Sequence, residues 1–363
     1  MKRIVFTVTN DLSYDQRMQR ICSSLAKNGY NVLLVGRKLN SSVALKNESY
    51  QQKRLYCFFK NGFLFYAEYN LRLFFFMLFI KIDAACAIDL DTILTCYCIT
   101  QLRGKKRIHD AHELFTEMKE VITRPSIRKF WTRVEKFMVP EFEFGYTVSY
   151  SIAEEFRKRY NVSYDVIRNI PIKRSMESTT VNDKIILYQG AVNEARGLEN
   201  LVAAMQQVDA ILHIYGDGNI YKKIESLVKA TSLEEKVILK GKVVPGKLHA
   251  ITQQSYIGIN LVEPLGLNQL YSLANKFFDY MHAGIPQVTM NFPEYKKIND
   301  EYKIAVLINS VDINEIAAAL NLLTQDQVLY NELKNNCSVA REIFNWQQEE
   351  KKLINFYKNV FPD

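Results

Sequence analysis

Short apolar runs and segments with helical spacing alternate along the first half of this 363-residue chain. Residues 4–9 form an apolar run that predicts a strand. Met18 and Ile21 then recur at the spacing of one helix face, and Gly29 stands where such a helix would end. Residues 31–36 predict a second strand. A strand, a helix and a strand in this order require parallel pairing through a right-handed crossover.

The same alternation continues and then restarts after a polar segment. The remaining predicted strands are, in chain order, residues 84–88, 107–109, 146–149, 185–190, 210–215, 237–241, 257–262 and 287–290. Helices are expected near residues 198–207 and 221–230. We therefore predict an α/β protein with two Rossmann-like, doubly wound domains. They would face a central cleft, with the ligand at the carboxyl ends of the strands.

The length of the chain also favours two domains. We expect an N-terminal domain at residues 1–168, a linker at 169–184 and a C-terminal domain at 185–340. Residues 341–363 should form a helix that crosses back to the N-terminal domain.

Composition is ordinary for a soluble globular protein, with 48% hydrophobic and 24% charged residues. The most apolar stretch, residues 63–82, is interrupted by Glu68, Arg72 and Lys81, so a membrane-spanning helix is not expected. Because the chain opens directly into a strand, we expect no signal peptide. Its six cysteines contain no Cys-x-x-Cys pair, which favours buried thiols in a reducing cytosol.

Candidate ligand groups in the second half follow predicted strands or open helices. They are Gly190, Arg196-Gly197, Gly216-Asp217-Gly218, residues 241–244 and Asn275-Lys276. Glycine at such turns lets backbone N–H groups approach a phosphate, and a helix N-terminus adds favourable potential. The first strand is followed by no Gly-x-Gly-x-x-Gly, and the chain has no Gly-Lys-Ser/Thr. These absences disfavour dinucleotide oxidoreductases and P-loop proteins.

Residues 267–286 carry the most informative of these groups. A polar loop becomes a helix with Lys276 and Asp279 three residues apart, and Gly284 and Pro286 end that helix. A cation and a carboxylate on the first turns of one helix suit a ligand with both phosphate and sugar hydroxyls.

Six segments together resemble a known family. They are residues 8–17, 88–92, 110–114, 188–199, 214–218 and 273–286, and they match in order and approximate spacing. The chain is similar to glycosyltransferase family 4, the retaining group 1 glycosyltransferases with the GT-B fold. The resemblance extends over nearly the whole chain and does not indicate a particular sugar.

The resemblance implies a role for each matching position. The N-terminal domain would bind the acceptor and the C-terminal domain a nucleotide sugar. Arg196 and Lys276 would bind the donor diphosphate, and His112 would reach the donor sugar, so these three are the expected catalytic residues. Asp279 would accept hydrogen bonds from the ribose. The other expected donor-binding residues are Gly190, Gly216, Asp217, Gly241, Val243 and Asn275, and the acceptor-side residues are Asn10, Asp11, Arg17 and Glu113. No metal or cofactor is expected.

The chain departs from the family pattern at three positions. Tyr271 stands where many members have the first motif glutamate, and Ala191 where many have a first phosphate-binding arginine. Asp279 is shorter than the usual glutamate. Asp217 between two glycines also fits turn chemistry.

Three functions are therefore kept open. The first is a retaining hexosyltransferase that moves a sugar from a nucleotide diphosphate to an acceptor hydroxyl, in cell-surface polysaccharide or glycoconjugate biosynthesis. The others are a nucleotide-sugar epimerase of the same fold and a non-catalytic nucleotide-sugar-binding subunit.

Charge is unevenly distributed along the chain. Residues 1–168 hold 27 Lys and Arg against 17 Asp and Glu, whereas the remaining 195 residues hold 20 against 22. Residues 124–138 interleave cations with apolar positions that would lie on one helix face. This pattern suits an anionic membrane surface and a glycan or lipid-linked acceptor; the alternative is that the face packs into its own domain. We expect a cytoplasmic protein docked peripherally on the membrane face, and no nucleic-acid partner, because no reader module is present.

Overall fold

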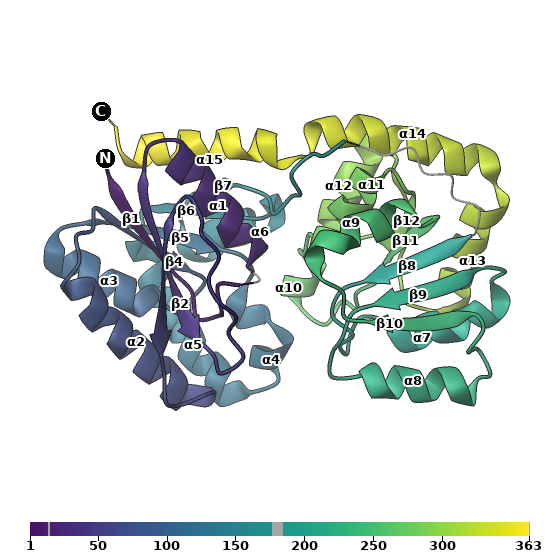
Figure 1. Ribbon diagram of the computed structural model, residues 1–363, viewed down its shortest axis with the longest axis horizontal. Helices are drawn as coiled ribbons and strands as arrows, with labels where there is room; N and C mark the ends of the chain where they lie inside the picture. Colours follow the sequence, from purple (N-terminus) through teal and green to yellow (C-terminus); the bar gives the residue numbers. More distant parts are fainter. Residues whose placement is uncertain (14, 176–183, 363) are drawn as a thin grey trace. The chain divides into compact units, whose positions relative to one another are not determined.

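The computed structural model describes residues 1–13, 15–175 and 184–362. These residues form two compact units (Figure 1). Unit 1 comprises Met1–Asn169 with the C-terminal segment that begins at Glu349, and unit 2 comprises Ile170–Gln348. The linker expected at residues 169–184 lies partly outside the described residues, which do not include 176–183.

Unit 1 is built on a seven-stranded parallel sheet with the order β3-β2-β1-β4-β5-β6-β7 in the described chain. Its strands are β1 (Arg3–Thr7), β2 (Asn31–Lys38), β3 (Gln51–Tyr56), β4 (Ala84–Ile88), β5 (Lys106–Ala111), β6 (Phe144–Thr147) and β7 (Asp165–Val166). The predicted strands of this half are confirmed with small shifts of their ends. No apolar run predicts β3 or β7, because β3 is a largely polar edge strand and β7 has two residues.

Helices cover this sheet. They are α1 (Gln16–Lys27), α2 (Gly62–Leu78), α3 (Ile93–Arg103), α4 (Lys119–Ile122), α5 (Pro125–Met138), α6 (Tyr150–Tyr160) and α15 (Trp346–Val360), with 3-10 turns η1 (Phe115–Glu117) and η2 (Val139–Glu141). α15 begins in unit 2 and ends in unit 1, where the Tyr357 ring lies 6.2 Å from that of Phe6 and 6.4 Å from that of Tyr146. The C-terminal helix therefore completes the core of the N-terminal unit.

Unit 2 has a six-stranded parallel sheet with the order β10-β9-β8-β11-β12-β13 among its described residues. The strands are β8 (Ile185–Gln189), β9 (Ile211–Tyr215), β10 (Val237–Gly241), β11 (Ile257–Asn260), β12 (Gln287–Met290) and β13 (Ala305–Ile308). The helices are α7 (Leu198–Ala204), α8 (Tyr221–Ala230), α9 (Pro245–Gln253), α10 (Leu267–Leu270), α11 (Asn275–Ala283), α12 (Pro293–Tyr302), α13 (Ile313–Gln325) and α14 (Gln327–Ile343), with the 3-10 turn η3 (Met205–Gln207).

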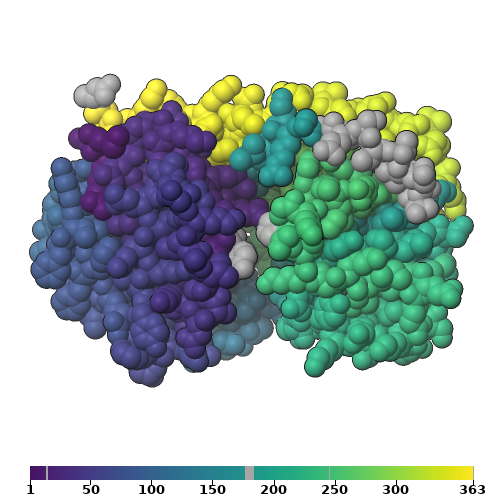
Figure 2. Space-filling model, viewed as in Figure 1, coloured from purple at the N-terminus to yellow at the C-terminus, as the bar shows by residue number. Residues whose placement is uncertain are grey.

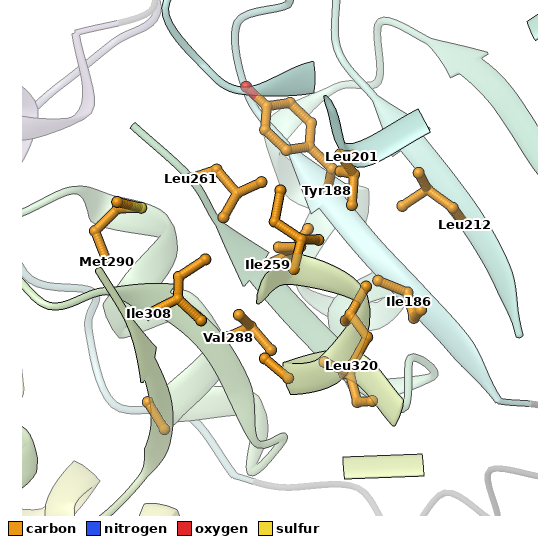
Figure 3. Packing of buried hydrophobic residues seen from close by; sticks show 14 of the residues in the cluster. Ile186, Tyr188, Leu201, Leu212, Ile259, Leu261, Val288, Met290, Ile308 and Leu320 are labelled. Atoms are coloured by element: carbon orange, nitrogen blue, oxygen red, sulfur yellow. The ribbon is translucent and has the colours of Figure 1, made fainter. Parts of the chain in front are cut away.

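Alternate residues of the unit 2 strands point to one face and form its core (Figure 3). Ile186, Ile259 and Val288 come from three neighbouring strands and are fully buried, and Leu201 of α7 and Leu320 of α13 pack over them. Burying one such side chain stabilises the fold by about 1.5–3 kcal/mol. Because this core fixes the strands, it also fixes where their carboxyl ends lie.

Candidate functional site

At the carboxyl ends of β8, β9 and β10, backbone hydrogen bonds join the glycines that follow or end these strands. Gly190 follows β8 and donates its N–H to the Tyr215 carbonyl at 2.9 Å, and Gly216 follows β9 and donates to the Gly241 carbonyl at 2.9 Å. The structure thus brings Gly190, Gly216 and Gly241, all predicted donor-binding residues, to one edge of the sheet.

Glycine is required where these loops touch. Gly216 has φ +154°, and a Cβ added to it would lie 1.8 Å from the Gly190 carbonyl oxygen. A Cβ on Gly218 would lie 2.3 Å from the Val192 carbonyl oxygen. The Gly-Asp-Gly turn is therefore a packing requirement of the sheet edge.

Asp217 sits in this turn with its carboxylate turned back on the chain. It is exposed and accepts a hydrogen bond from the Gly218 N–H at 2.8 Å. That contact is the turn chemistry considered above, and donor binding by Asp217 stays a prediction. Val243 is half-buried in the loop before α9, and the exposed Asn275 is the first residue of α11.

Lys276 lies over the end of β8. Its Nζ is 3.9 Å from the centroid of the Tyr188 ring, and the Tyr188 hydroxyl donates to the Ala191 carbonyl at 2.7 Å. An added Cβ on Gly190 would be 3.6 Å from this Nζ. Lys276 therefore projects onto the glycine turn that the sequence places in the donor site.

Arg196 is the second cation beside this turn. Burial and, to a smaller extent, the nearby Arg196 lower the pKa of Lys276 to about 7, although Asp279 acts in the opposite direction. Arg196 is held between two residues with left-handed backbone, Ala195 at φ +62° and Gly197 at φ +61°. In the described chain no ion pair joins Lys276 to a carboxylate. Two cations thus share one strand end without a resident anion on Lys276, which is the arrangement expected of a phosphate site.

Asp279 follows Lys276 by one turn of α11. Its Oδ2 accepts a hydrogen bond from Gln189 Nε2 at 2.8 Å, and Gln189 Oε1 accepts one from the Thr252 hydroxyl at 2.8 Å. Gln189 and Thr252 are buried, so this chain of bonds fixes one oxygen of the carboxylate. Neither residue is predicted from the sequence, because a glutamine ending a strand and a threonine in a helix have many ordinary roles.

Tyr271 occupies a break between two helices. α10 ends at Leu270, and the Tyr271 N–H donates to the Leu267 carbonyl at 2.9 Å. The expected loop before α11 thus contains one short helix. Tyr271 is half-buried. Its phenol cannot supply the carboxylate that the usual glutamate would have at this position.

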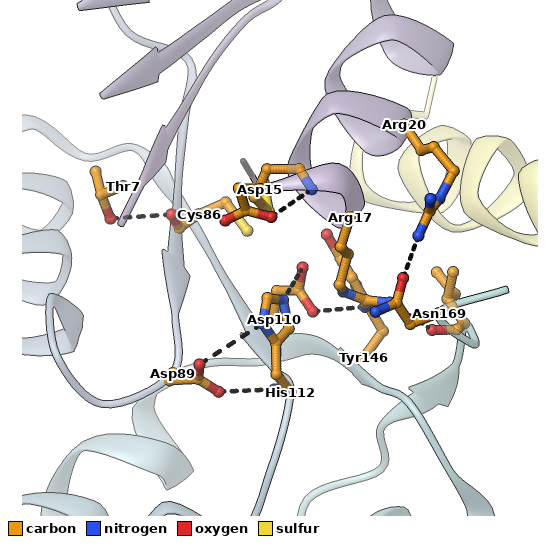
Figure 4. A network of polar contacts seen from close by, with 12 residues as sticks. Thr7, Asp15, Arg17, Arg20, Cys86, Asp89, Asp110, His112, Tyr146 and Asn169 are labelled. Carbon is orange, nitrogen blue, oxygen red and sulfur yellow. Dashed lines mark hydrogen bonds and ion pairs between the residues drawn. The ribbon is translucent and has the colours of Figure 1, made fainter. Parts of the chain in front are cut away.

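Unit 1 carries a separate polar network at the end of β5 (Figure 4). Asp110 is fully buried, and its Oδ1 lies 2.8 Å from Arg17 NH2 of α1. Arg17 also donates to the Ile167 carbonyl at 3.1 Å. Burial raises the pKa of Asp110, but Arg17 and His112 lower it more, so it ends well below its usual range. Asp110 is therefore ionised at neutral pH.

His112 lies between two carboxylates in this network. Its Nε2 is 3.3 Å from Asp110 Oδ2, its Nδ1 is 3.7 Å from Asp89 Oδ2, and its backbone N–H donates to Asp89 Oδ1 at 2.7 Å. Burial lowers the pKa of His112, but Asp110 and Asp89 outweigh it and raise the pKa to about 9. The imidazole is thus a cation at neutral pH, with 24% of its side chain exposed.

The residues predicted on the acceptor side lie in different environments. Arg17 is 4% exposed and bound to Asp110, so the structure gives it an internal partner. Asp11 pairs with Arg54 of β3 at 2.8 Å, whereas the exposed Asn10 donates to Asp15 at 3.0 Å. The half-buried Glu113 follows His112. Direct acceptor contact by these residues stays a prediction.

Two polar residues of unit 1, Asp89 and Arg54, were not predicted as site residues. Asp89 follows β4 and holds His112, and Arg54 holds Asp11 from β3. The acidic pattern at residues 88–92 could have indicated Asp89. Nothing marks Arg54, since β3 itself is not predicted.

In the part of the chain that the structure describes, no group of three or more His, Cys, Asp or Glu side chains could hold a metal ion. The expectation that neither metal nor cofactor is needed stays a prediction.

Replacing Gly216 by Ala should lower the free energy of unfolding by about 1–3 kcal/mol, because the new methyl overlaps the Gly190 carbonyl. Chemical denaturation measures this. Gly246→Ala in α9 is the matched control: its Cβ would meet nothing within 4 Å, and alanine is the better helix residue by roughly 0.5–1 kcal/mol. Equal stability of the Gly216 variant and the wild type would refute the packing argument.

His112 should titrate above the ordinary histidine value of about 6.5. Since its folded pKa is raised, its stabilising interaction is present below about 6.5 and is lost as the pH rises through about 9. NMR titration of the imidazole C–H resonances measures the pKa directly. Asp89→Asn should lower it, whereas Asp326→Asn, which removes a carboxylate from the start of α14 in unit 2, should leave it unchanged. An ordinary pKa in the wild type would contradict the network.

Comparisons with known proteins give a family match for one part of the chain and the fold of the whole. Residues 170–339 match the family model described as glycosyl transferases group 1. A search of curated protein sequences gives no match.

Solved structures share the fold at low sequence identity. Sucrose-phosphate synthase from Thermosynechococcus elongatus superposes with a TM-score of 0.81 at 17% identity, covering 99% of both chains. Anabaena HepE, solved in complex with UDP and glucose, gives 0.77 at 11% identity, covering 99% of this chain and 100% of HepE. TarM from S. aureus, a mutant solved with Fondaparinux, alpha-GlcNAc-glycerol and UDP, gives 0.73 at 12% identity over the whole of both chains. Residues 170–339 therefore match the group 1 glycosyltransferase family, and the solved structures show that the chain as a whole has the GT-B fold.

Proposed function

We propose that this glycosyltransferase moves a hexose from a nucleotide diphosphate to an acceptor hydroxyl with retention of configuration. Unit 2 binds the donor and unit 1 the acceptor. The observation that carries the proposal is the pair of cations, Lys276 and Arg196, at the strand edge that also holds Asp279. UDP in the HepE and TarM complexes supports a nucleoside diphosphate as the ligand class.

The cations act where negative charge develops. As the bond between the sugar and the β-phosphate oxygen breaks, the diphosphate gains charge, which Lys276 and Arg196 offset in the proposed site. The acceptor oxygen then forms the new bond on the same face of an oxocarbenium-like sugar, and its proton passes to the departing phosphate oxygen. Both bonds and the proton are accounted for without a cofactor.

Asp279 and His112 have supporting roles in this proposal. Gln189 holds one oxygen of Asp279, and in this proposal the carboxylate accepts hydrogen bonds from the ribose hydroxyls. His112 is a cation held by two carboxylates, and its fixed positive charge suits the oxygens of a donor sugar.

The proposed acceptor is a glycan or a lipid-linked glycan in cell-surface polysaccharide or glycoconjugate biosynthesis. The proposed setting is the cytoplasmic face of a membrane, with the basic segment at residues 124–138 as its contact. The structure has no helix among its described residues that is long and apolar enough to cross a bilayer.

Lys276→Ala and Arg196→Ala should each lower glycosyl transfer about 10²–10³-fold, the usual loss when a donor aimed at developing charge is removed. Lys229→Ala, an exposed cation of α8, is the control and should transfer at the wild-type rate. A panel of nucleotide sugars scored by thermal shift first identifies the donor, because a ligand that binds the native state raises the melting temperature.

Transfer is then measured with that donor and a set of glycan acceptors. Unchanged transfer in both variants would sink the proposed roles of Lys276 and Arg196. Conversion of the donor without any acceptor would instead indicate an epimerase, and binding without any product a non-catalytic subunit.

A further inference from the structure

Helix α2 of unit 1 is apolar on the side that faces its sheet and also on the opposite side. Four residues at four-residue spacing are buried against the sheet, Phe65, Tyr69, Leu73 and Met77. The Tyr69 hydroxyl donates to the Val8 carbonyl and so fixes this side inward. A surface helix ordinarily carries polar residues on its other side.

The outward side of α2 carries large apolar side chains. Phe63 is 72% exposed, Leu71 58% and Phe75 52%, and Phe79 directly after the helix is 82% exposed. Scattered apolar residues are normal on protein surfaces, but several on one helix mark an interaction site. α2 contributes these side chains to the outer surface of unit 1, which Figure 2 shows from one side.

Helix α5 extends the same surface. Trp131 and Val134 are buried, which confirms in part the alternative that this face packs into its own unit. Phe130 and Phe137 nevertheless remain 44% and 65% exposed. The Phe130 ring lies 6.4 Å from the Phe63 ring of α2, so the exposed aromatics of the two helices adjoin. We call the exposed faces of α2 and α5 the aromatic-basic surface.

The charge of this surface is strongly positive. Residues 58–81 hold three Lys and Arg against one Glu, and residues 119–138 hold six against two. Glu68 pairs with Arg72 at 2.8 Å, and Glu117 pairs with Arg128 at 3.2 Å, so these two cations are offset. Glu135 is buried against Thr116 and Tyr160. Lys129, Arg133 and Lys136 are exposed and keep the surface positive.

Exposed phenylalanines beside exposed cations fit an anionic bilayer better than another copy of this chain. A two-fold interface would place this positive surface against itself, and like charges there oppose association. An anionic lipid surface instead accepts the aromatic rings at the level of its headgroups. It also attracts each nearby Lys or Arg by about 1 kcal/mol.

We propose that unit 1 docks on anionic lipid bilayers through the aromatic-basic surface, with the outward phenylalanines of α2 inserted and the cations of α5 at the headgroups. This inference rests on the membrane setting proposed above and extends its contact from residues 124–138 to α2, which supplies the apolar part. The surface is separate from the donor-binding residues of unit 2, so its test is independent of the proposed transfer reaction.

Vesicle flotation of the full chain tests the proposal. The wild type should float with vesicles of phosphatidylcholine and phosphatidylglycerol, much less with phosphatidylcholine alone, and less as salt is added. The triple variant Phe63→Ser, Phe75→Ser and Phe79→Ser should lower binding at least tenfold. Lys129→Gln with Arg133→Gln and Lys136→Gln should lower it and weaken its salt dependence.

The matched control places three serines on exposed apolar positions of α14, Val328, Val339 and Ile343, and should bind as the wild type does. Thermal melting and the nucleotide-induced thermal shift check that each variant is folded. Absence of wild-type flotation, or full flotation of the phenylalanine variant, would overturn the proposal. So would a concentration-dependent dimer that this variant abolishes without any binding of the wild type to vesicles, since the surface would then serve self-association.

Discussion

The site in unit 2 depends on two cations held close together at the end of a parallel strand. Lys276 is drawn toward Tyr188 and Gly190 by the geometry of α11, and Arg196 is fixed by the backbone turn that opens α7. Burial and mutual repulsion disfavour the charged form of Lys276, which its pKa of about 7 expresses. An anion bound between Lys276 and Arg196 would offset both the burial and the repulsion of the charged Lys276. The protein core thus maintains an arrangement that an anion would complement, and in the proposed function that anion is a diphosphate.

The polar network of unit 1 places a cation between carboxylates, whereas unit 2 places two cations together. In unit 1 a single imidazole lies between two carboxylates, and those carboxylates raise its pKa. Arg17 neutralises part of the charge of Asp110 from the other side. His112 consequently stays a cation at neutral pH with both ring nitrogens directed at acidic partners. A histidine held in this way suits a fixed electrostatic contact better than rapid proton exchange.

The fold could be predicted from the sequence because a parallel sheet buried on both faces has strongly apolar strands. The apolar pattern did not predict strands that lack this burial or are very short. β3 lies at a sheet edge and is polar, and β7 has only two residues. β13 is an apolar strand of only four residues, and no strand was predicted there.

The site was predictable only where a motif carries its chemistry. Lys276, Asp279 and the glycine turns stand in local patterns that imply their positions. Gln189 and Thr252 lie 63 residues apart and meet only through the packing of α9 on β8, so no local pattern could join them. The exposed face of α2 is a similar case. Its apolar composition is visible in the sequence, but only the structure shows which side the sheet covers.

The central claim is that the cations of unit 2 await a diphosphate, and proton uptake on binding tests it most directly. Calorimetric titration at pH 8 is carried out in buffers of different ionisation enthalpy. The ligand is the nucleoside diphosphate of the nucleotide sugar that the thermal-shift panel selects. Because Lys276 is then mostly neutral and the bound diphosphate favours its charged form, we predict an uptake approaching about one proton per nucleotide. Lys276→Met should bind more weakly and take up almost none. Tight binding with no proton uptake by the wild type, or equal uptake by the variant, would contradict the account.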